Sequence, residues 1–319
     1  MRRYVAGRLA QAVGVLWAAY TVSFLVLDYL PGDPVSAMAA GGMDSGQIDP
    51  VRIAELKHQY GFDEPVPLQY ADHLGRAVRG DLGDSISTGR SVTSTLGDAL
   101  PPTLALTGLA LLLAVVLGGG LAVLATGTRQ RWLRQLALSV PPLGVSVPTF
   151  WVGLVLVELF SFRLRWFPAF GDDGPRGLVL PAVTLAVPTG ALVAQVLAKS
   201  LLTALEQPYA ETARAKGASP LRIHLRHALR NASLPALTVV GLLAGQLIAG
   251  SVVVETVFSR DGVGRLTAGA VAAQDIPLVQ GVVVFGALVF VLANLIVDLV
   301  CPLLDPRIVV APNRRGSLT

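Results

Sequence analysis

The chain has 319 residues, of which 53% are hydrophobic and only 14% are charged. Soluble globular domains carry roughly 25% charged residues, so this composition excludes an ordinary soluble protein and indicates a membrane protein. The formal net charge is only +4, and the single cysteine, Cys301, lies in an apolar run. One cysteine excludes a disulfide framework and a thiolate metal cluster within the chain.

Six apolar segments are long enough to cross the roughly 30 Å hydrocarbon core of a bilayer, which takes about 20 residues of helix. The predicted spans are residues 9–30, 103–126, 136–160, 178–201, 237–258 and 279–303. Prolines interrupt the third and fourth spans, and neighbouring groups in a helix bundle satisfy the backbone that a proline frees. The sequence therefore predicts an all-α integral membrane protein with six transmembrane helices.

The first span follows Arg2 and Arg3, an arrangement that also occurs in signal peptides. Its apolar run is longer than that of a signal peptide, and no clear cleavage site follows it. We therefore expect residues 1–30 to form a retained N-terminal transmembrane helix.

The hydrophilic segment of residues 31–100 is too long to be a simple turn. It opens with Leu-Pro-Gly-Asp-Pro at residues 30–34, which is a turn signal. Two amphipathic helices are expected after this turn, and Gly61 is the expected stop of the first. Their apolar positions are Val51, Ile53, Leu56 and Tyr60 in the first, and Leu68, Leu74, Val78 and Leu82 in the second.

The distribution of charge predicts the orientation of the spans. With the N-terminus in the cytoplasm, the inside segments hold most of the 25 basic residues and only three acids, Glu206, Glu211 and Asp305. Cytoplasmic loops of membrane proteins carry such an excess of Lys and Arg. We therefore expect both termini to be cytoplasmic and residues 31–100 to lie on the external side.

The second long hydrophilic segment, residues 203–233, falls on the inside between the fourth and fifth spans. It is rich in Ala and Arg, which favours helix. Gly217 supplies a bend, Ser219 can cap a helix N-terminus, and Pro220 suits the first helical position. The sequence predicts a helix, a sharp bend, and a short second helix from Pro220 to about Asn231.

Motifs for nucleotide binding and catalysis are absent from the sequence, which has neither a phosphate-binding Gly-x-x-x-x-Gly-Lys-Ser/Thr loop nor a His-Glu-x-x-His motif. The spacing of His224 and His227 permits a shared metal, but a solvated or docking face is the commoner arrangement. Anionic lipid is another candidate ligand of this basic segment. A polytopic membrane enzyme and a secondary transporter are the alternative functions. Against them, no span holds a histidine to activate Ser139, Ser146 or Ser251, and no convincing internal repeat is present.

The run Tyr-Ala-Glu-Thr-Ala-Arg-Ala-Lys-Gly at residues 209–217, with Leu-Pro at 234–235, resembles the signature loop of bacterial ABC import permeases. Further motifs resemble the first permease subunit of dipeptide, oligopeptide and nickel importers. They are Leu-Pro-Gly-Asp-Pro at 30–34, Arg-Gly-Asp-Leu-Gly at 79–83 before Ser85, Glu-Thr-Val-Phe at 255–258, Gly-Val-Gly-Arg-Leu at 262–266, Asn-Leu-Ile-Val-Asp at 294–298 and Leu-Asp-Pro-Arg at 304–307. The resemblance covers nearly the whole chain.

The resemblance implies a type I ABC importer permease in the bacterial plasma membrane, with di- or oligopeptides as substrate. Its core would be residues 101–310 and its cytoplasmic tail residues 311–319. A second homologous permease would complete the pathway, and two separate or fused ATPase subunits would bind ATP and Mg²⁺. An external binding protein or lipoprotein would deliver the substrate. The resemblance implies no catalytic residue, cofactor, metal or nucleic acid for this chain, and it leaves nickel chelates, glutathione-like peptides and other small solutes as alternative substrates.

The resemblance also assigns residues to roles. The ATPase-coupling residues would be Tyr209, Glu211, Ala213, Arg214, Gly217, Ala218, Pro220 and Leu221. Glu211 could instead pair with Arg214 on the helix surface. Acids within spans mark functional positions because charge is costly in lipid, so the pathway or gate candidates are Glu158, Glu255 and Asp298. For Asp298, snorkelling of the side chain to the membrane interface or a helix–helix pair is the alternative. The external docking candidates are Asp81, Arg260 and Asp261, although residues 259–261 depart from the Ser-x-Pro turn of the family.

Overall fold

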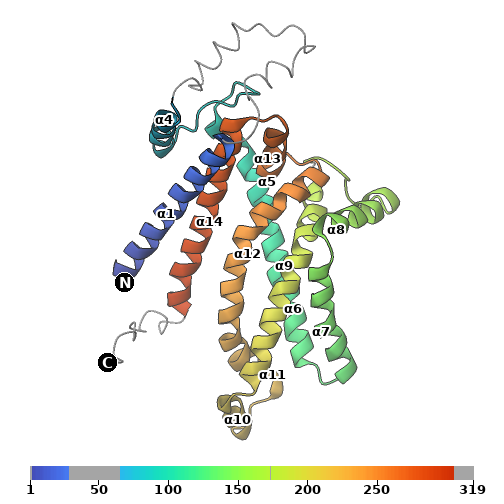
Figure 1. The fold of residues 1–319 in the computed structure, drawn as a ribbon. Coiled ribbons are helices and arrows are strands. Elements are labelled where there is room, and N and C mark those ends of the chain that lie inside the picture. The colour runs from blue at the N-terminus through green and yellow to red at the C-terminus, as the bar shows by residue number, and fades with distance from the viewer. Residues whose placement is uncertain (1, 29–64, 173, 305–319) are drawn as a thin grey trace. The chain divides into compact units, whose positions relative to one another are not determined.

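The computed structural model describes residues 2–28, 65–172 and 174–304, and these are almost entirely helical (Figure 1). The predicted helical class is therefore confirmed for this part of the chain. The turn at residues 30–34, the first amphipathic helix at 51–60 and the tail at 311–319 lie outside the described residues. The chain divides into two compact units. Unit 1 is built on Leu104–Arg260, with the short end segments Met1–Val5 and Leu292–Thr319, and unit 2 comprises Ala6–Thr103 and Asp261–Val291.

Unit 2 contains most of α1 (Arg2–Asp28), all of α4 (Val66–Val78), and the beginning of α5 (Val92–Leu113). The second amphipathic helix is confirmed as α4, but its packing face differs from the prediction. Leu68 is 59% exposed and Val78 is 81% exposed. Instead, the α4 residue Tyr70 packs edge-on against Phe24 of α1 and shares a 2.8 Å hydrogen bond with the Thr21 hydroxyl. An aromatic ring buries more area than an aliphatic side chain, which explains the choice of face.

Unit 2 is completed by α13 (Val263–Ala272) and the beginning of α14 (Ile276–Leu304). Their apolar side chains form one core with α5, made of Val92, Leu96, Val263, Ala270, Leu278 and Val282. The first turn of α13 is also fixed by a polar contact, because the Val263 backbone amide donates a 2.8 Å hydrogen bond to the buried Thr103 hydroxyl.

Unit 1 is a bundle around α9 (Gly174–Leu205), whose residues are mostly buried. The helix of α5 continues into it through the π-helical turn η1 (Ala114–Gly118) and α6 (Gly119–Gly127). Two apolar clusters hold the bundle together, one around Leu106, Leu185 and Phe258 and the other around Ala122, Leu201 and Ala232. The second cluster is rich in alanine because the helices approach closely there.

Unit 1 also contains the polar segment between α9 and α12. This segment consists of α10 (Pro208–Ala215), α11 (Pro220–Arg222) and η3 (Ile223–Ala228). The remaining elements of unit 1 are α7 (Arg131–Ser146), α8 (Thr149–Leu156) and η2 (Val157–Arg163), which precede α9, and α12 (Leu229–Val257). Gly118 shows how tightly α5–α6 and α9 pack, because a Cβ atom at this position would overlap the carbonyl oxygen of Gly190. Only glycine at position 118 permits this approach of two backbones.

Several helices in the described residues are long and apolar enough to cross a membrane. They are Ala6–Leu27, Val92–Gly127, Gly174–Leu205 and Pro220–Val257, and the apolar helix Ile276–Leu292 is shorter. The protein is therefore a multi-pass membrane protein, as its composition predicts. The first, second, fourth and fifth predicted spans correspond to these four helices.

The third predicted span is not a single straight helix. The chain bends by 102° between Arg131–Ser146 and Thr149–Arg163. Val147 adopts an extended conformation directly before Pro148, which is the conformation that a proline imposes on its predecessor. The described residues thus hold four spanning helices, or five if this bent pair counts as one span.

Candidate functional site

The segment between α9 and α12 forms the bend that the sequence predicts. Helix α10 begins with Pro208 at its first position and ends at Ala215, with Lys216 as its C-cap. Gly217 follows with a φ of +81°, a conformation that is costly for residues with a Cβ atom. Its amide donates to the Arg214 carbonyl at 2.9 Å, and the Ala218 amide donates to the Ala213 carbonyl at 3.0 Å. The glycine therefore closes α10 and reverses the chain direction.

The second helix starts as predicted but does not stop as predicted. The Ser219 side chain accepts a 3.4 Å hydrogen bond from the Arg222 amide, and Pro220 occupies the first helical position. The helix then continues through η3 into α12 as far as Val257, so the expected end near Asn231 is wrong. No glycine lies between positions 218 and 240, and Pro235 is accommodated inside the helix.

Most of the predicted coupling residues lie on the surface of this bend. Glu211, Arg214, Gly217, Pro220 and Leu221 are exposed, and we call these five residues the coupling surface. Tyr209, Ala213 and Ala218 are partly buried beneath it, and the Tyr209 hydroxyl oxygen is buried with no hydrogen-bond partner among the described atoms.

The coupling surface combines an apolar side chain with free charges. Leu221 is 67% exposed on the short helix α11. In the described part of the chain, Glu211 and Arg214 do not form the ion pair that was the alternative interpretation of Glu211. Exposed charges of both signs beside an apolar side chain give a partner protein groups on which it can orient.

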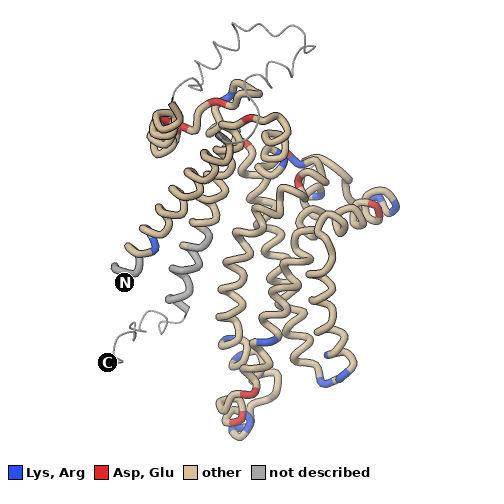
Figure 2. The backbone as a smooth tube through the Cα atoms, in the orientation of Figure 1, with Lys and Arg blue, Asp and Glu red and all other residues tan. Residues whose placement is uncertain are grey.

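The bend is anchored to the end of α6. The Thr126 hydroxyl lies 3.3 Å from the His224 Nε2 atom, and it also donates to the Ala122 carbonyl at 2.7 Å. Ile223 and Ala228 are fully buried on the same side. Basic residues of the α6–α7 turn and of the α10–η3 segment therefore gather at one end of unit 1 (Figure 2).

The two histidines of this segment do not converge. His224 is 5% exposed and faces Thr126, whereas His227 is exposed. The described residues contain no group of three or more His, Cys, Asp or Glu side chains placed to hold a metal ion. The structure therefore gives no support to a metal shared by this pair.

The three gate candidates differ from one another in the structure. Glu255 is only 1% exposed near the end of α12, so it is enclosed by the chain rather than presented on its surface. Glu158 is exposed and forms a 3.0 Å ion pair with Arg163 in η2. The side chain of Asp298 lies outside the described residues.

The three docking candidates also differ from one another in their exposure. Arg260 is 5% exposed and forms an ion pair with Asp172, so its assignment to an external docking surface is wrong. The reason is that the chain turns inward after α12 and buries this side chain against the loop before α9. Asp81 and Asp261 are exposed and pair with Arg76 at 2.9 Å and with Arg265 at 3.0 Å. The Arg76 guanidinium and the Gly83 amide hold the pKa of Asp81 below its usual range.

Asp275 is a buried polar residue that the sequence analysis missed. Its carboxylate, in unit 2, accepts hydrogen bonds from the Ser85 hydroxyl at 2.6 Å and from the Ser87 hydroxyl at 2.7 Å. The backbone amides of Ser87, Ile86 and Leu278 also donate to it. The only sequence signal was an isolated acid before an apolar helix, and nothing in the sequence linked it to residues 85–87.

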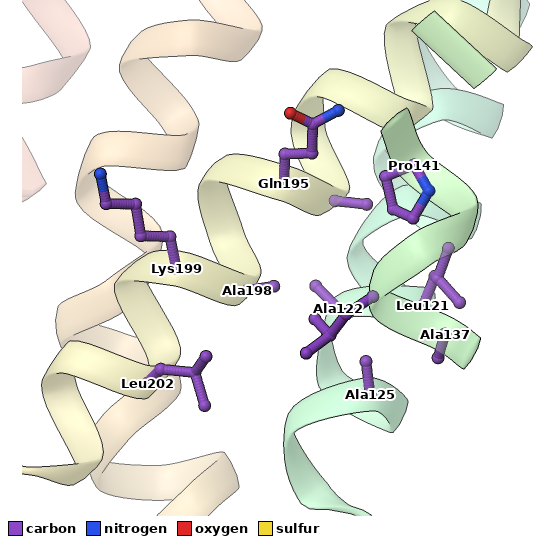
Figure 3. Close-up of a pocket in the computed structure, with 11 residues that line it drawn as sticks. Leu121, Ala122, Ala125, Ala137, Pro141, Gln195, Ala198, Lys199 and Leu202 are labelled. Carbon is purple, nitrogen blue, oxygen red and sulfur yellow. The ribbon is translucent and has the colours of Figure 1, made fainter. Parts of the chain in front are cut away.

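A cavity of about 220 Å³ opens between α6, α7 and α9 in unit 1 (Figure 3). Most of its lining is apolar, including Leu121, Pro141 and Leu202, and the polar lining residues are Gln195 and Lys199. No lining residue is a carboxylate, so the cavity does not suit a divalent cation. None of the predicted site residues lines it.

Comparisons with known proteins agree with this architecture. The family model of the binding-protein-dependent transport system inner membrane component matches residues 114–310, and the model of its N-terminal region matches residues 1–107. A glutathione transport system permease protein, GsiC of Escherichia coli O6:H1, is 36% identical over 308 residues, which cover 97% of this chain and 99% of that protein. A probable peptide ABC transporter permease protein of Sinorhizobium fredii is 36% identical over 313 residues, covering 96% of this chain and 98% of that protein.

Among solved structures, an inward-facing conformation of the MetNI methionine ABC transporter has a similar fold. The TM-score is 0.56 at 19% identity, and the match covers 66% of this chain and 96% of that chain. This likeness concerns the fold alone.

Proposed function

The chain belongs to the family of binding-protein-dependent transport system inner membrane components and is a permease subunit of a peptide-type ABC importer, and we propose that its coupling surface binds an ATPase subunit. The chain itself is not an ATPase. The proposal rests above all on Leu221, which is 67% exposed at the tip of a bend that is covalently joined to two long helices. A lever of this kind can transmit the movement of a motor to the membrane helices.

The charge of the bend fits this role. Glu211 and Arg214 are exposed without pairing to each other, so a partner with complementary charges can orient on them. The small residues Ala213 and Gly217 allow a close approach of the partner's backbone. Closure of the ATPase subunits would then shift the permease between inward-facing and outward-facing states.

We further propose the six-span topology with both termini in the cytoplasm. In unit 1, the basic α6–α7 turn and the basic α10–η3 segment lie at one end (Figure 2), which supports a cytoplasmic location of that end by the positive-inside rule. The bent pair of α7 and α8–η2 would supply the third span, and α14 the sixth. Residues 31–100 would then lie outside the cell.

The partners proposed for this chain are a second permease, two ATPase subunits that bind ATP and Mg²⁺, and an external substrate-binding protein. This chain would bind no cofactor of its own. Di- or oligopeptides are the proposed substrates, and the glutathione permease among the relatives supports a short peptide. Asp81 and Asp261 are the external docking residues that stay exposed, and Glu255 is the gate candidate at the end of α12.

Replacing Leu221 with Glu tests the ATPase contact. The exposed side chain makes few contacts within the chain, so Leu221→Glu should leave folding and membrane insertion intact. A carboxylate in place of an apolar contact should reduce the ATPase subunits that co-purify with the permease by roughly tenfold or more, because burying an unpaired charge in an interface is costly. Val78→Glu is the matched control, because it also replaces an exposed apolar side chain with a carboxylate: Val78, in α4, is 81% exposed. Normal co-purification of the ATPases with Leu221→Glu would refute the proposed contact.

A further inference from the structure

One buried guanidinium joins the two helices that flank the coupling segment. Arg260 follows the end of α12, and its Nη2 atom forms an ion pair with Asp172, in the loop before α9. Its Nη1 atom donates to the Gly177 carbonyl in the first turn of α9 at 3.2 Å, and more weakly to the Gly171 carbonyl at 3.4 Å. The Arg260 side chain is 7% exposed and that of Asp172 is 36% exposed.

The backbone around this guanidinium is tightly fitted. The Gly171 amide donates to the Phe258 carbonyl at 3.0 Å, and the Arg260 amide donates to the Glu255 carbonyl at 2.8 Å. A Cβ atom at Gly177 would be in van der Waals contact with the Gly171 carbonyl oxygen at 3.4 Å and with the Arg260 Nη1 atom at 3.7 Å. Phe258, which is 2% exposed, belongs to the apolar cluster beneath these contacts. Water therefore has little access to the buried side of the Arg260 guanidinium.

The energetic consequence differs from that of a surface ion pair. An exposed pair such as Arg90–Asp98, with side chains 59% and 69% exposed, contributes little because solvent screens it. A buried arginine is instead strongly destabilised when its carboxylate is removed, since the charge is then left unpaired. The Arg260–Asp172 pair thus holds the end of α12 and the start of α9 together as long as Arg260 stays buried.

Helices α9 and α12 are therefore connected at both of their ends. At one end the α10–η3 bend joins them covalently, and at the other end Arg260 joins them through Asp172 and Gly177. The two helices also pack through both apolar clusters along their length, and packed helices can still slide past each other by small shear movements when one end is pushed. Two helices fixed at both ends move together.

We propose that Arg260 is a positioning residue for transport: its clasp to Asp172 and Gly177 makes α9 and α12 one lever, so that movement at the coupling surface reaches the far end of unit 1. This inference rests on the proposed function of the coupling surface. It gives Arg260 a role inside the lever in place of the external docking role that its sequence position indicated.

The test is the number of peptides transported per ATP hydrolysed. The complete importer, with both permeases, the ATPases and the binding protein, is reconstituted in proteoliposomes. Uptake of a defined mixture of di-, tri- and tetrapeptides that includes glutathione is quantified by mass spectrometry beside ATP hydrolysis. Arg260→Met and Asp172→Asn should lower the peptide-to-ATP ratio by roughly tenfold while the complex still hydrolyses ATP, because an unlocked lever dissipates the movement.

Two further variants give the result its specificity. Arg260→Lys keeps a positive charge beside Asp172 but not the fork of donors, so it should recover part of the ratio. Arg90→Met removes an arginine from an exposed ion pair and should leave the ratio unchanged. If Arg260→Met fails to assemble, Asp172→Asn decides the question, because it keeps a carbonyl acceptor at position 172 and leaves Arg260 its contacts to the Gly177 and Gly171 carbonyls.

A wild-type peptide-to-ATP ratio in Asp172→Asn would overturn the inference, as would a wild-type ratio in Arg260→Met. Failure of the proposed function has a different signature. In that case Leu221→Glu would retain the ATPase subunits, whatever Arg260→Met does. If Leu221→Glu loses the ATPases while Asp172→Asn couples normally, the coupling surface stands and the clasp alone is refuted.

Discussion

The Ser85 hydroxyl donates a 2.6 Å hydrogen bond to the carboxylate of Asp275, which lies 190 residues further along the chain. Asp275 is fully buried, and the neighbouring hydroxyl and amide of Ser87 donate to the same carboxylate. One carboxylate therefore fixes the loop before α5 to the turn between α13 and α14 in unit 2.

Replacing Asp275 with Ala should loosen this loop. The substitution leaves the amides of Ile86, Ser87 and Leu278 without their acceptor, and each unpaired buried donor costs about 1–3 kcal/mol of stability. We expect a lower thermal unfolding midpoint of the purified permease and faster proteolytic cleavage within residues 84–91. Asp98→Ala removes an exposed carboxylate that is paired with Arg90, and it should change neither quantity.

Because the Asp275 carboxylate can be protonated, we expect the stability of the folded permease to depend on pH. Burial by itself raises the pKa of Asp275, but the hydrogen bonds from Ser85, Ser87 and Ile86 outweigh it and hold the pKa below its ordinary value. A lowered pKa in the folded state means that the stabilisation is complete above the unfolded-state pKa of about 4 and is lost as the pH falls through the folded-state value. Cleavage within residues 84–91 should therefore accelerate below about pH 4 in the wild type. If Asp275→Asn showed the same acid dependence, another group would be responsible.

Gly217 provides a test of the bend itself. Its φ of +81° lies in the region that favours glycine, and a Cβ atom there would meet no other atom within 4 Å. Gly217→Ala should therefore strain only the backbone, by about 1–2 kcal/mol, and lower substrate-stimulated ATP hydrolysis without affecting membrane insertion. Gly120→Ala is the control, because Gly120 lies within α6 and also has open space around it. Equal hydrolysis by both variants would mean that the conformation of Gly217 is not needed for coupling.

A pair of adjacent glycines tests the packing of α9. A Cβ atom at Gly118 would overlap the carbonyl oxygen of Gly190, whereas at Gly119 its nearest neighbour would be the Leu197 Cδ2 atom at an ordinary 3.8 Å. Gly118→Ala should destabilise unit 1 by about 1–3 kcal/mol through overpacking, and Gly119→Ala should not. Thermal unfolding in detergent compares the two variants directly. Similar unfolding midpoints of the two variants would contradict the close approach of η1 and α9.

Much of the helical architecture could be predicted because hydrophobic length and capping residues are local properties. Gly217, Ser219 and Pro220 each act on their own backbone, and the structure places the bend where these residues predict it. The end of the second helix could not be predicted in this way. No local stop signal exists near Asn231, so the helix continues into α12.

The errors concern contacts between segments that are distant in the sequence. Arg260 follows a predicted span in a polar turn, which suggested exposure, but Asp172 and Gly177 bury it. Asp275 and Ser85 carried no shared signal, although they are hydrogen-bonded. The 102° bend at Pro148 was also missed, because prolines within membrane helices are often accommodated without a break.

The location of the coupling surface is tested most directly by labelling Leu221→Cys in a Cys301→Ser background, which removes the only native cysteine. A membrane-impermeant maleimide is applied to right-side-out spheroplasts and to inside-out vesicles that contain the importer. The account predicts labelling only in inside-out vesicles, and protection of the cysteine there when the ATPase subunits are bound. Labelling of intact spheroplasts, or labelling of inside-out vesicles that the bound ATPases do not reduce, would contradict it.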